Sequence, residues 1–548
     1  MTRLFPGILV FLLGTILAPG PAAHAAPSPE EEPRWFGADP GEGTVPYPYI
    51  AEPIDSWVNE TVEREIALGN LRGIPAHIRP HPRALLAQRV AEAYARGRRS
   101  VGLERLAREL AWEARFMGLD LPFRDTRPWL SFGPAASHVK FNGLIRAGGR
   151  FEEGEPPDLG TQSLVGFRGV YWGPGGLSLL GEFFVNEHEG AARFGNVVFQ
   201  DSDIQYNPNR FVAKVHGRFW EVWFGREHAR WGPGRSGGLL LGGTRTPFGQ
   251  FGYTFHLGDF ITATAVHAWL SAAEGRYAAY HRAEFNPGKG LRLGLAEGVR
   301  YDRSSPDPLY LVNLITYAAV ERLNTLEGSP DADGQSLFRS NVLASADFYW
   351  RFAPGTAAYG ELMVDDFNDR VSPTRMAYQL GARHEFSGRR RLLLQGEYTR
   401  VYNYTYSVYY GRDFEHAGEP LGYPAGPDVA DLNLWADLDL NLEWSVGVRA
   451  FHRRSGEGTL GSPWCPETLA DLGEDTSHCQ TVDNRASGRE MAGVVETRTG
   501  FSAGPTFSPR DNLRLEIETG IVVFDDFEHV PGAETTRLTA RAAAAWRW

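Results

Sequence analysis

The chain of 548 residues contains very little sulfur, with only 2 cysteines and 5 methionines. Cys465 and Cys479 lie together in one hydrophilic segment, without the additional ligands and close spacing of a metal site. Two such thiols pair in an oxidising compartment, and closing the loop between them would stabilise the fold by about 3 kcal/mol. The sequence therefore predicts a Cys465–Cys479 disulfide and no metal centre.

The chain also lacks the signatures of several protein classes. Beyond its N-terminal segment, no apolar run approaches the ~20 residues of a membrane-spanning helix. No G-x-S-x-G, H-E-x-x-H, Walker or dinucleotide-binding motif occurs, so we expect neither enzymatic activity nor a cofactor. The formal net charge of -12 argues against nucleic acid as a partner.

Glycine and aromatic residues are abundant instead, with 63 Gly, 32 Phe, 21 Tyr and 15 Trp. Aromatic residues suit the interfacial girdles of a membrane β-barrel, and glycine suits its tight turns. The C-terminal residues alternate: Leu538, Ala540, Ala542, Ala544, Trp546 and Trp548 share one face, opposite Thr539, Arg541 and Arg547. This pattern predicts a strand with one face in lipid and one in a polar lumen. The final aromatic residue is similar to the assembly signal of bacterial outer-membrane barrels.

The N-terminal part divides into three predicted regions. Residues 1–25 have a positive start, an apolar stretch and an A-x-A site, as in a secretory signal peptide. Residues 26–53 form a Pro-rich linker. Residues 54–130 change to a helical period, with helices expected at 54–68, from Pro82 to Gly97 and from Ser100 to Gly118. We expect a small periplasmic helical bundle here.

Residues 131–548 alternate with a period of two and predict a transmembrane antiparallel outer-membrane β-barrel. The clearest strand covers residues 431–444, where every second residue is apolar. The connections counted back from Trp548 alternate between short and long, as do the periplasmic turns and external loops of such barrels. This regular alternation of short and long connections predicts about 18 strands. A count of sixteen follows if the segment near residues 252–257 is not a strand.

Three segments resemble the capsule-assembly Wzi family. They are the stretch around Arg-Trp-Gly-Pro-Gly at 230–234 with the Leu-rich residues after it, residues 359–367, and residues 397–406 with 421–428. The helical region before the barrel is similar to that family as well. The resemblance implies an eighteen-stranded barrel with a periplasmic helical bundle, acting as a surface lectin that holds capsular polysaccharide. It carries over no individual sugar-contacting residue.

Arginine and tyrosine residues provide the candidate carbohydrate site. Arg226, Arg230 and Arg235 could line the lumen or its mouth, where guanidinium groups suit carboxylates and hydroxyl groups of sugars. The alternative is that this segment is only a strand-ending turn. Tyr409 and Tyr410 lie within a long loop and are free to meet glycan, whereas the nearby residues 402–406 fit an external aromatic girdle.

Paired carboxylates at Asp365-Asp366 and Asp525-Asp526 end two strands at the predicted outer rim. Oxygen ligands of this kind suit Ca²⁺. Two carboxylates fall short of a full coordination shell, however, and solvated strand ends are the alternative.

The sequence thus predicts a lectin-like outer-membrane protein that retains or helps assemble capsule or exopolysaccharide at the cell surface. Its expected partners are the surface polysaccharide, outer-membrane lipids and, during biogenesis, the barrel assembly machinery. A porin for small solutes is the alternative, because the same lumen charges would set its selectivity. A lipid-modifying outer-membrane enzyme is a third hypothesis, since a barrel can pair a histidine and a serine from neighbouring strands.

Overall fold

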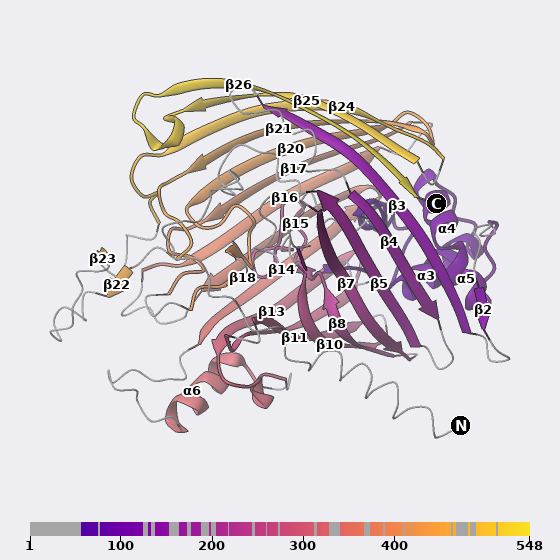
Figure 1. Ribbon diagram of the computed structural model, residues 1–548, viewed down its shortest axis with the longest axis horizontal. Coiled ribbons are helices and arrows are strands. Elements are labelled where there is room, and N and C mark those ends of the chain that lie inside the picture. Colours follow the sequence, from indigo (N-terminus) through magenta and orange to yellow (C-terminus); the bar gives the residue numbers. More distant parts are fainter. Residues whose placement is uncertain are drawn as a thin grey trace. The chain divides into compact units, whose positions relative to one another are not determined.

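The long strands of the chain form an antiparallel meander that closes when the last strand, β26, pairs with the first, β3. Figure 1 shows this closed wall of strands. The computed structural model describes residues 56–547 except 75–76, 124–129, 133–136, 153–163, 173–176, 188–196, 199–203, 218, 244–246, 259, 272–273, 312–314, 328–339, 366–372, 387–389, 409–411, 417, 462–463, 467–479, 483–488 and 511–512. All of them belong to one unit of the chain, Pro40–Trp548.

Eighteen long strands make up the barrel within the described residues, which confirms the predicted number. They are β3 (Ser137–Glu152), β4 (Leu164–Trp172), β5 (Leu177–Glu187), β7 (Ile204–His216), β8 (Trp220–Glu227), β10 (Phe248–Leu257), β11 (Ile261–Ser271), β12 (Arg276–Gly288), β13 (Leu291–Asp302), β14 (Asn341–Ala353), β15 (Thr356–Asp365), β16 (Met376–Phe386), β17 (Arg391–Val401), β20 (Val429–Asp439), β21 (Trp444–Ser455), β24 (Glu496–Arg510), β25 (Leu513–Asp525) and β26 (Glu534–Arg547). The segment that favoured a count of sixteen forms the regular strand β10.

Short strands accompany this wall. β2 (Leu130–Phe132) pairs with the start of β3, and β6 (Val197–Val198) pairs with β7. The remaining pairs are β1 (Ile78–Arg79) with β9 (Arg230–Trp231), β18 (Glu415–His416) with β19 (Glu419–Pro420), and β22 (Trp464–Pro466) with β23 (Gln480–Val482).

The outward face of the barrel is apolar because the strands alternate as the sequence predicts. On β20, Leu432 and Leu434 are exposed, and the Leu434 side chain is 49% accessible. The residues between them, Asp431 and Asn433, are buried on the lumen side. Apolar side chains exposed outward are the rule for a surface that meets lipid rather than water. The fold is therefore that of an outer-membrane β-barrel.

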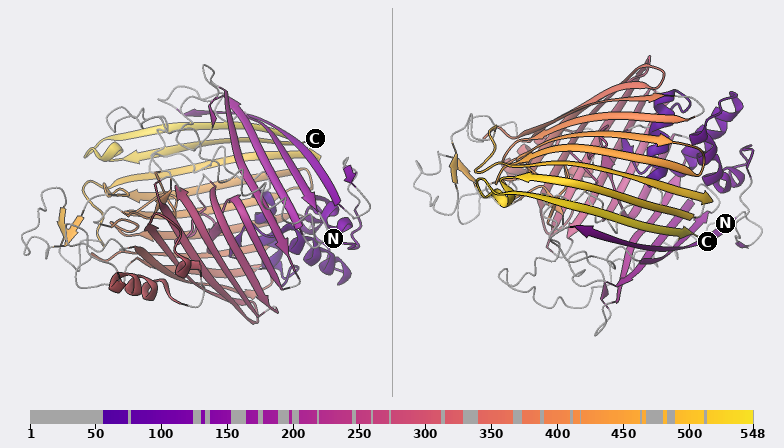
Figure 2. Two further views of the ribbon diagram at one scale, coloured as in Figure 1. Left: turned by 60° about the horizontal axis from the view of Figure 1, so that its bottom comes forward. Right: turned by 90° about the horizontal axis from the view of Figure 1, so that it is seen from above.

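The two ends of the barrel differ in their connections. At one end, called the turn end, residues 289–290, 354–355 and 440–443 join consecutive strands. At the other, called the loop end, the connections are long and include residues 303–340 and 402–428. This is the alternation that the sequence predicts. The two further views of Figure 2 show the long connections at one end of the strands.

Within the described residues, four helices precede the barrel: α2 (Ser56–Leu68), α3 (Arg83–Ala95), α4 (Val101–Glu109) and α5 (Ala111–Phe116). The prediction of one helix from Ser100 to Gly118 was wrong, because that segment breaks at Leu110 into α4 and α5. Ser100 caps α4 by accepting a hydrogen bond from the Leu103 amide over 3.0 Å. Apolar residues from the four helices, including Val62, Leu86 and Leu106, form one buried cluster.

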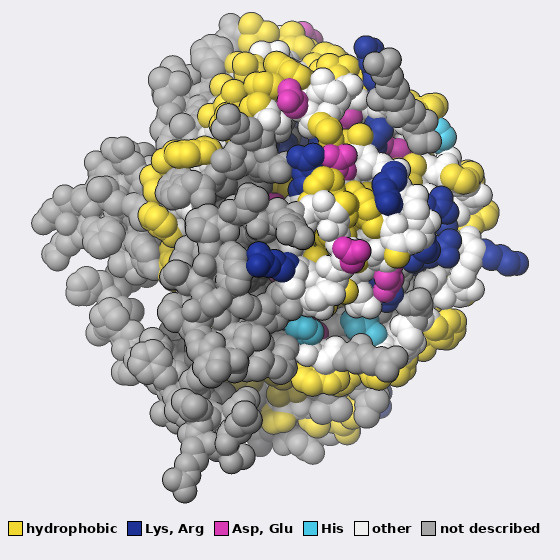
Figure 3. Space-filling view, turned by 90° about the vertical axis from the view of Figure 1, so that its right-hand side faces the viewer, with side chains coloured by type: hydrophobic (Ala, Val, Ile, Leu, Met, Phe, Trp, Pro, Cys, Tyr) yellow, Lys and Arg dark blue, Asp and Glu magenta, His cyan; other side chains and the backbone are white. Residues whose placement is uncertain are grey.

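The helical region contacts the turn end of the barrel. Arg64 of α2 donates two hydrogen bonds to the Glu385 carboxylate, at 3.0 and 2.8 Å. Arg105 of α4 donates to the carbonyl oxygen of Leu442 over 2.7 Å, and the Gly355 amide donates to Ala67 over 3.0 Å. Figure 3 looks at the side on which α3, α4 and α5 lie in Figure 1, where charged side chains gather across the face.

One connection at the loop end folds over the outside of the wall. It contains a 3-10 helix, η4 (Pro308–Leu311), and the helix α6 (Tyr317–Glu327), which covers polar residues on the outward face of β12 and β13. His281 lies 3.2 Å from the Glu297 carboxylate, which also accepts the Tyr317 amide over 2.7 Å. No described helix is both long enough and apolar enough to cross a membrane.

Candidate functional site

Residues 228–243, called the plug segment, leave the wall between β8 and β10 and enter the lumen. There β9 pairs with β1 from the N-terminal region, with Ile78 opposite Trp231. The Gly232 amide donates to the carbonyl oxygen of His77 over 3.0 Å. Segments from both ends of the barrel therefore meet in a two-stranded sheet inside it.

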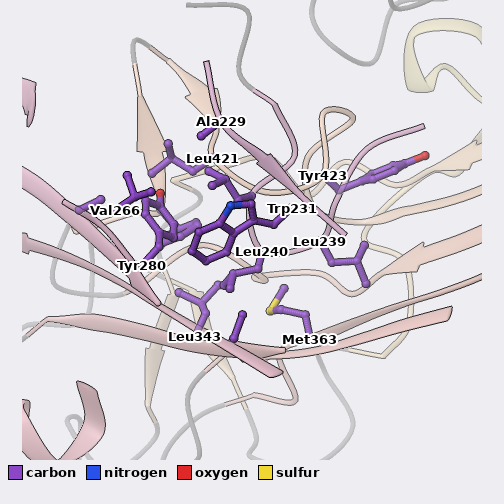
Figure 4. Close-up of a cluster of buried hydrophobic side chains, with 14 of the residues drawn as sticks. Ala229, Trp231, Leu239, Leu240, Val266, Tyr280, Leu343, Met363, Leu421 and Tyr423 are labelled. Atoms are coloured by element: carbon purple, nitrogen blue, oxygen red, sulfur yellow. The ribbon is translucent and has the colours of Figure 1, made fainter. Parts of the chain in front are cut away.

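The plug segment forms the centre of an apolar core. Trp231, Leu239, Leu240 and Leu241 are almost fully buried. Figure 4 shows Trp231 and Leu240 between side chains of the wall, such as Tyr280 and Met363. The same cluster includes Val266, Ala268, Ala278, Ala296, Leu343, Ala377, Val401 and Val429 of the wall and Phe414, Leu421 and Tyr423 of the loop after β17.

Hydrogen bonds to lumen carboxylates tether the plug segment. The Leu239 amide donates to Glu361 of β15 over 3.1 Å. The amides of Arg235 and Ser236 donate to the two oxygens of Glu397 of β17, at 2.7 and 3.0 Å. A glycine-rich segment has few side chains of its own, so the wall provides the acceptors that its backbone needs.

The N-terminal region is tethered in the same way. His77, which lies next to β1, contacts the Asp347 carboxylate of β14 over 2.5 Å, and the same carboxylate accepts two hydrogen bonds from Arg282 of β12 at 2.6 and 3.0 Å. All three side chains are buried. A buried charge is stabilised only when paired and hydrogen-bonded, and this triad meets that condition.

The three predicted arginines occupy different environments. Arg230 donates to the carbonyl oxygens of Gly234 and Arg235, the latter over 3.0 Å, and so it braces the turn within the plug segment. Arg235 forms an ion pair of 2.7 Å with Asp437 of β20. Arg226 lies opposite Phe211 and Gly249 in register, on the other face of β8 from the lumen residue Glu227. The structure brings Arg230 and Arg235 together but places Arg226 away from them.

Two of the tyrosines that follow β17 do not form the predicted external girdle. Strand β17 ends at Val401, so its alternation does not extend into residues 402–406. Tyr404 and Tyr406 have positive φ values and are buried, and Tyr406 belongs to the apolar core around the plug segment. The girdle interpretation was therefore wrong for these two residues. Tyr409 and Tyr410 lie outside the described residues.

The remaining candidates give a mixed result. Asp365 is buried, and its carboxylate accepts a hydrogen bond from the Tyr406 amide over 2.6 Å. At the loop end, the Asp526 carboxylate accepts a hydrogen bond from the Gly532 amide over 2.6 Å. No group of three or more potential metal ligands occurs in the described part of the chain.

Cys465 lies in β22 opposite Thr481 of β23, but Cys479 is outside the described residues, so the disulfide stays a prediction.

The lumen is filled unevenly. The lumen faces of β14 to β17 are buried, as with Tyr359, Glu361 and Gln379. By contrast, some lumen-facing residues of β25 and β26 remain partly exposed, such as Glu516 at 27% and Arg541 at 11%. The plug segment therefore packs against one part of the wall, and water reaches the lumen face of the other part.

A group of polar and aromatic side chains lies where these two parts meet. Trp435 of β20 is half-buried, with the guanidinium carbons of Arg235 and Arg449 4.9 and 6.0 Å from the centre of its ring. Arg449 of β21 donates two hydrogen bonds to the Asn433 side chain, at 2.6 and 3.2 Å. Alternation along β20 predicts that Trp435 faces the lumen. No sequence signal reveals that the plug segment places Arg235 against it.

These features define a plugged outer-membrane β-barrel. Among solved structures, this chain is similar to Wzi of Escherichia coli, an outer membrane protein involved in group 1 capsule assembly and a carbohydrate-binding β-barrel. The TM-score is 0.59 at 14% identity, over 90% of this chain and 98% of that chain. OprD and OccK10 of Pseudomonas aeruginosa each give a TM-score of 0.41, at 11% and 12% identity, over 75% of this chain and 93% and 99% of theirs. No family model and no curated protein matches the sequence. At 14% identity the likeness concerns the fold alone.

Proposed function

We propose that this protein is a lectin-like barrel of the bacterial outer membrane that binds surface polysaccharide and retains or helps assemble it at the cell surface. The observation that carries the proposal is the plug segment, whose Trp231, Leu239 and Leu240 fill the lumen between β11 and β17. A diffusion porin needs a continuous aqueous lumen, and an apolar core opposes it.

Two further features support binding over transport. The plug segment is tethered by Glu361 and Glu397 on one side and pairs with β1 on the other, so opening it would break several buried hydrogen bonds together. The fold that this chain shares over most of its length with a carbohydrate-binding barrel also supports the proposal. The signal peptide predicted at residues 1–25 would direct export of the chain, and the C-terminal aromatic residue would then serve as the signal for barrel assembly in the outer membrane.

Deleting the gene and following the polysaccharide tests the proposal. Cells without the protein should make the same amount of polysaccharide but release more of it into the medium, and the full-length gene should restore retention. Unchanged retention in the deletion strain would contradict the proposal.

A porin is the second candidate, and the half-buried lumen face of β25 and β26 is the observation that favours it. Planar bilayers separate the two functions. The wild-type protein should conduct little, whereas a variant lacking residues 236–242 should conduct steadily because the core around Trp231 and Leu239 is lost. Steady wild-type conductance at the level of this variant would favour the porin.

A further inference from the structure

The lumen contains an open space beside Asp437. Gly447 of β21 lies opposite Asp437 in register, and a side chain built at this glycine would meet only one Asp437 oxygen within 4 Å, at 3.7 Å. Most other glycines that face the plug segment or a neighbouring strand would meet an atom at much shorter range, as Gly234 and Gly381 do. The space beside Gly447 is therefore not occupied by the plug segment.

Chemically different groups border this space. Trp435 is two residues before Asp437 on the same face of β20, and Arg449 is two residues after Gly447 on the same face of β21. Arg235 reaches the same place from the plug segment, and its side chain and that of Asp437 remain 24% and 26% exposed. An indole ring, a carboxylate and two guanidinium groups thus surround one water-accessible position.

This combination fits a sugar ring. The C–H groups on one face of a pyranose are apolar and pack on an aromatic ring, while its hydroxyl groups need donors and acceptors around the edge. Asp437 supplies acceptor oxygens, and Arg235 and Arg449 supply N–H donors in planar forks.

Beyond this space, the lumen face of the wall is polar on β24, β25 and β26. Ser502 of β24 donates to Glu518 of β25 over 2.6 Å, and Arg541 of β26 lies 3.9 Å from Glu516. Ser502 is buried, whereas the side chains of Glu516, Glu518 and Arg541 on β25 and β26 remain partly exposed in the lumen. A polymer longer than one sugar would therefore meet further carboxylate and guanidinium groups beyond Trp435.

We propose that the surface formed by Trp435, Asp437, Arg449 and Arg235 is a saccharide subsite inside the lumen, which binds one pyranose unit of a polysaccharide. The proposal rests on the polysaccharide-binding function and adds the place of contact. The plug segment has a second role in it, because Arg235 helps to form the subsite.

Two variants test the subsite, each with a matched control. Trp435→Ala removes the ring, and Leu434→Ala removes a side chain from the outward face of the same strand. Gly447→Leu fills the space and leaves Trp435 intact, while Val448→Leu adds volume to the outward face of β21. Heat-modifiable migration on gels establishes that every variant is folded.

The probes are dextran, polygalacturonate and the surface polysaccharide extracted from the producing cells, with affinity measured by titration calorimetry in detergent. We expect Trp435→Ala and Gly447→Leu to weaken binding about tenfold, the order of one aromatic contact, with both controls at wild-type affinity. Comparing dextran with polygalacturonate shows whether the bound unit is neutral or acidic.

Wild-type affinity in both folded test variants would overturn the subsite while leaving the proposed function in place, and the contact would then lie in the loops. A wild-type protein that binds none of the three polymers would overturn the proposed function and the subsite together. Weakening by Trp435→Ala without weakening by Gly447→Leu would also overturn the subsite, because the space beside Asp437 would then have no role.

Discussion

The hydroxyl group of Tyr406 donates a hydrogen bond to the carbonyl oxygen of Leu239 over 2.6 Å and accepts one from the Tyr423 amide over 3.0 Å. Tyr406 belongs to the loop after β17, Leu239 to the plug segment and Tyr423 to the segment before β20. One buried side chain therefore joins the plug segment to the loop end of the barrel. Its positive φ of 75° is unusual for a residue other than glycine and depends on this tertiary packing.

Replacing Tyr406 by Phe should loosen the plug segment. The change leaves a buried carbonyl and a buried amide without their partner, which costs about 1–3 kcal/mol. We expect a lower thermal unfolding temperature and more frequent brief openings in single-channel recordings. Tyr398→Phe is the control, because this tyrosine is exposed on the outward face of β17. Equal behaviour of the two variants would show that the Tyr406 hydroxyl does not hold the plug segment.

The closing strand β26 offers a test of which face meets lipid. Ala542 lies opposite Ile517 on the outward face, whereas its neighbour Ala543 lies opposite Glu516 on the lumen side. Arginine on the lipid face near the middle of a strand costs about 2–4 kcal/mol. Ala542→Arg should therefore lower the yield of folded, heat-modifiable barrel, while Ala543→Arg gains a carboxylate partner and should fold normally. The opposite ranking would reverse the assigned faces.

Cysteine labelling of intact cells tests the orientation. In a background with Cys465→Ser and Cys479→Ser, an impermeant reagent should label Pro531→Cys at the loop end. It should not label Lys289→Cys in the turn between β12 and β13, although both positions are exposed. Permeabilised cells should show labelling at both positions. Labelling of Lys289→Cys in intact cells would place the helical region outside the cell.

His81, which lies between β1 and α3, is a buried histidine, and we expect it to make the protein less stable in acid. Burial lowers the pKa of His81 from 6.5 to about 3, so the native protein disfavours the proton that the unfolded chain binds below pH 6.5. The free energy of unfolding should fall as the pH drops from about 6.5 toward 3, by up to about 1.4 kcal/mol per pH unit from this group.

A His81→Gln variant should lose stability less steeply over this range, as measured by thermal unfolding at several pH values. His452→Gln is the control, since His452 is exposed on β21. Parallel pH profiles for wild type and His81→Gln would exclude His81 as the cause.

The barrel wall was predictable because each strand carries its own pattern. Leu432 and Leu434 alternate with Asp431 and Asn433, and pairing between neighbouring strands is nearly all local. The alternation failed after Val401, where the chain leaves the wall and φ becomes positive at Tyr404 and Tyr406. No periodic signal marks such a change of direction.

Two other regions could not be predicted in the same way: the contacts inside the lumen, and the polar residues that helix α6 covers on the outward face of β12 and β13. Arg235 and Asp437 are 202 residues apart in the chain, and nothing local in either segment specifies their ion pair. His281 and Glu297 occupy lipid-facing positions in the alternation, and only the helix α6 that covers them makes their polarity acceptable. Both sites arise from tertiary contacts of long loops.

The pairing of β1 with β9 has a consequence for how the chain folds. Most contacts in the wall join strands that are consecutive in the chain. Arg79 and Gly232, by contrast, form a hydrogen bond across 153 residues of sequence, and β3 can pair with β26 only after all the strands between them have formed. Contacts of such high sequence separation have the largest loop-closure entropy cost, so we expect them to form late. A chain arrested before these steps would be a sheet with two open edges and an unanchored plug segment. Proteases should cut that intermediate readily, so the half-life during assembly, more than the equilibrium stability, would limit how much protein reaches the membrane.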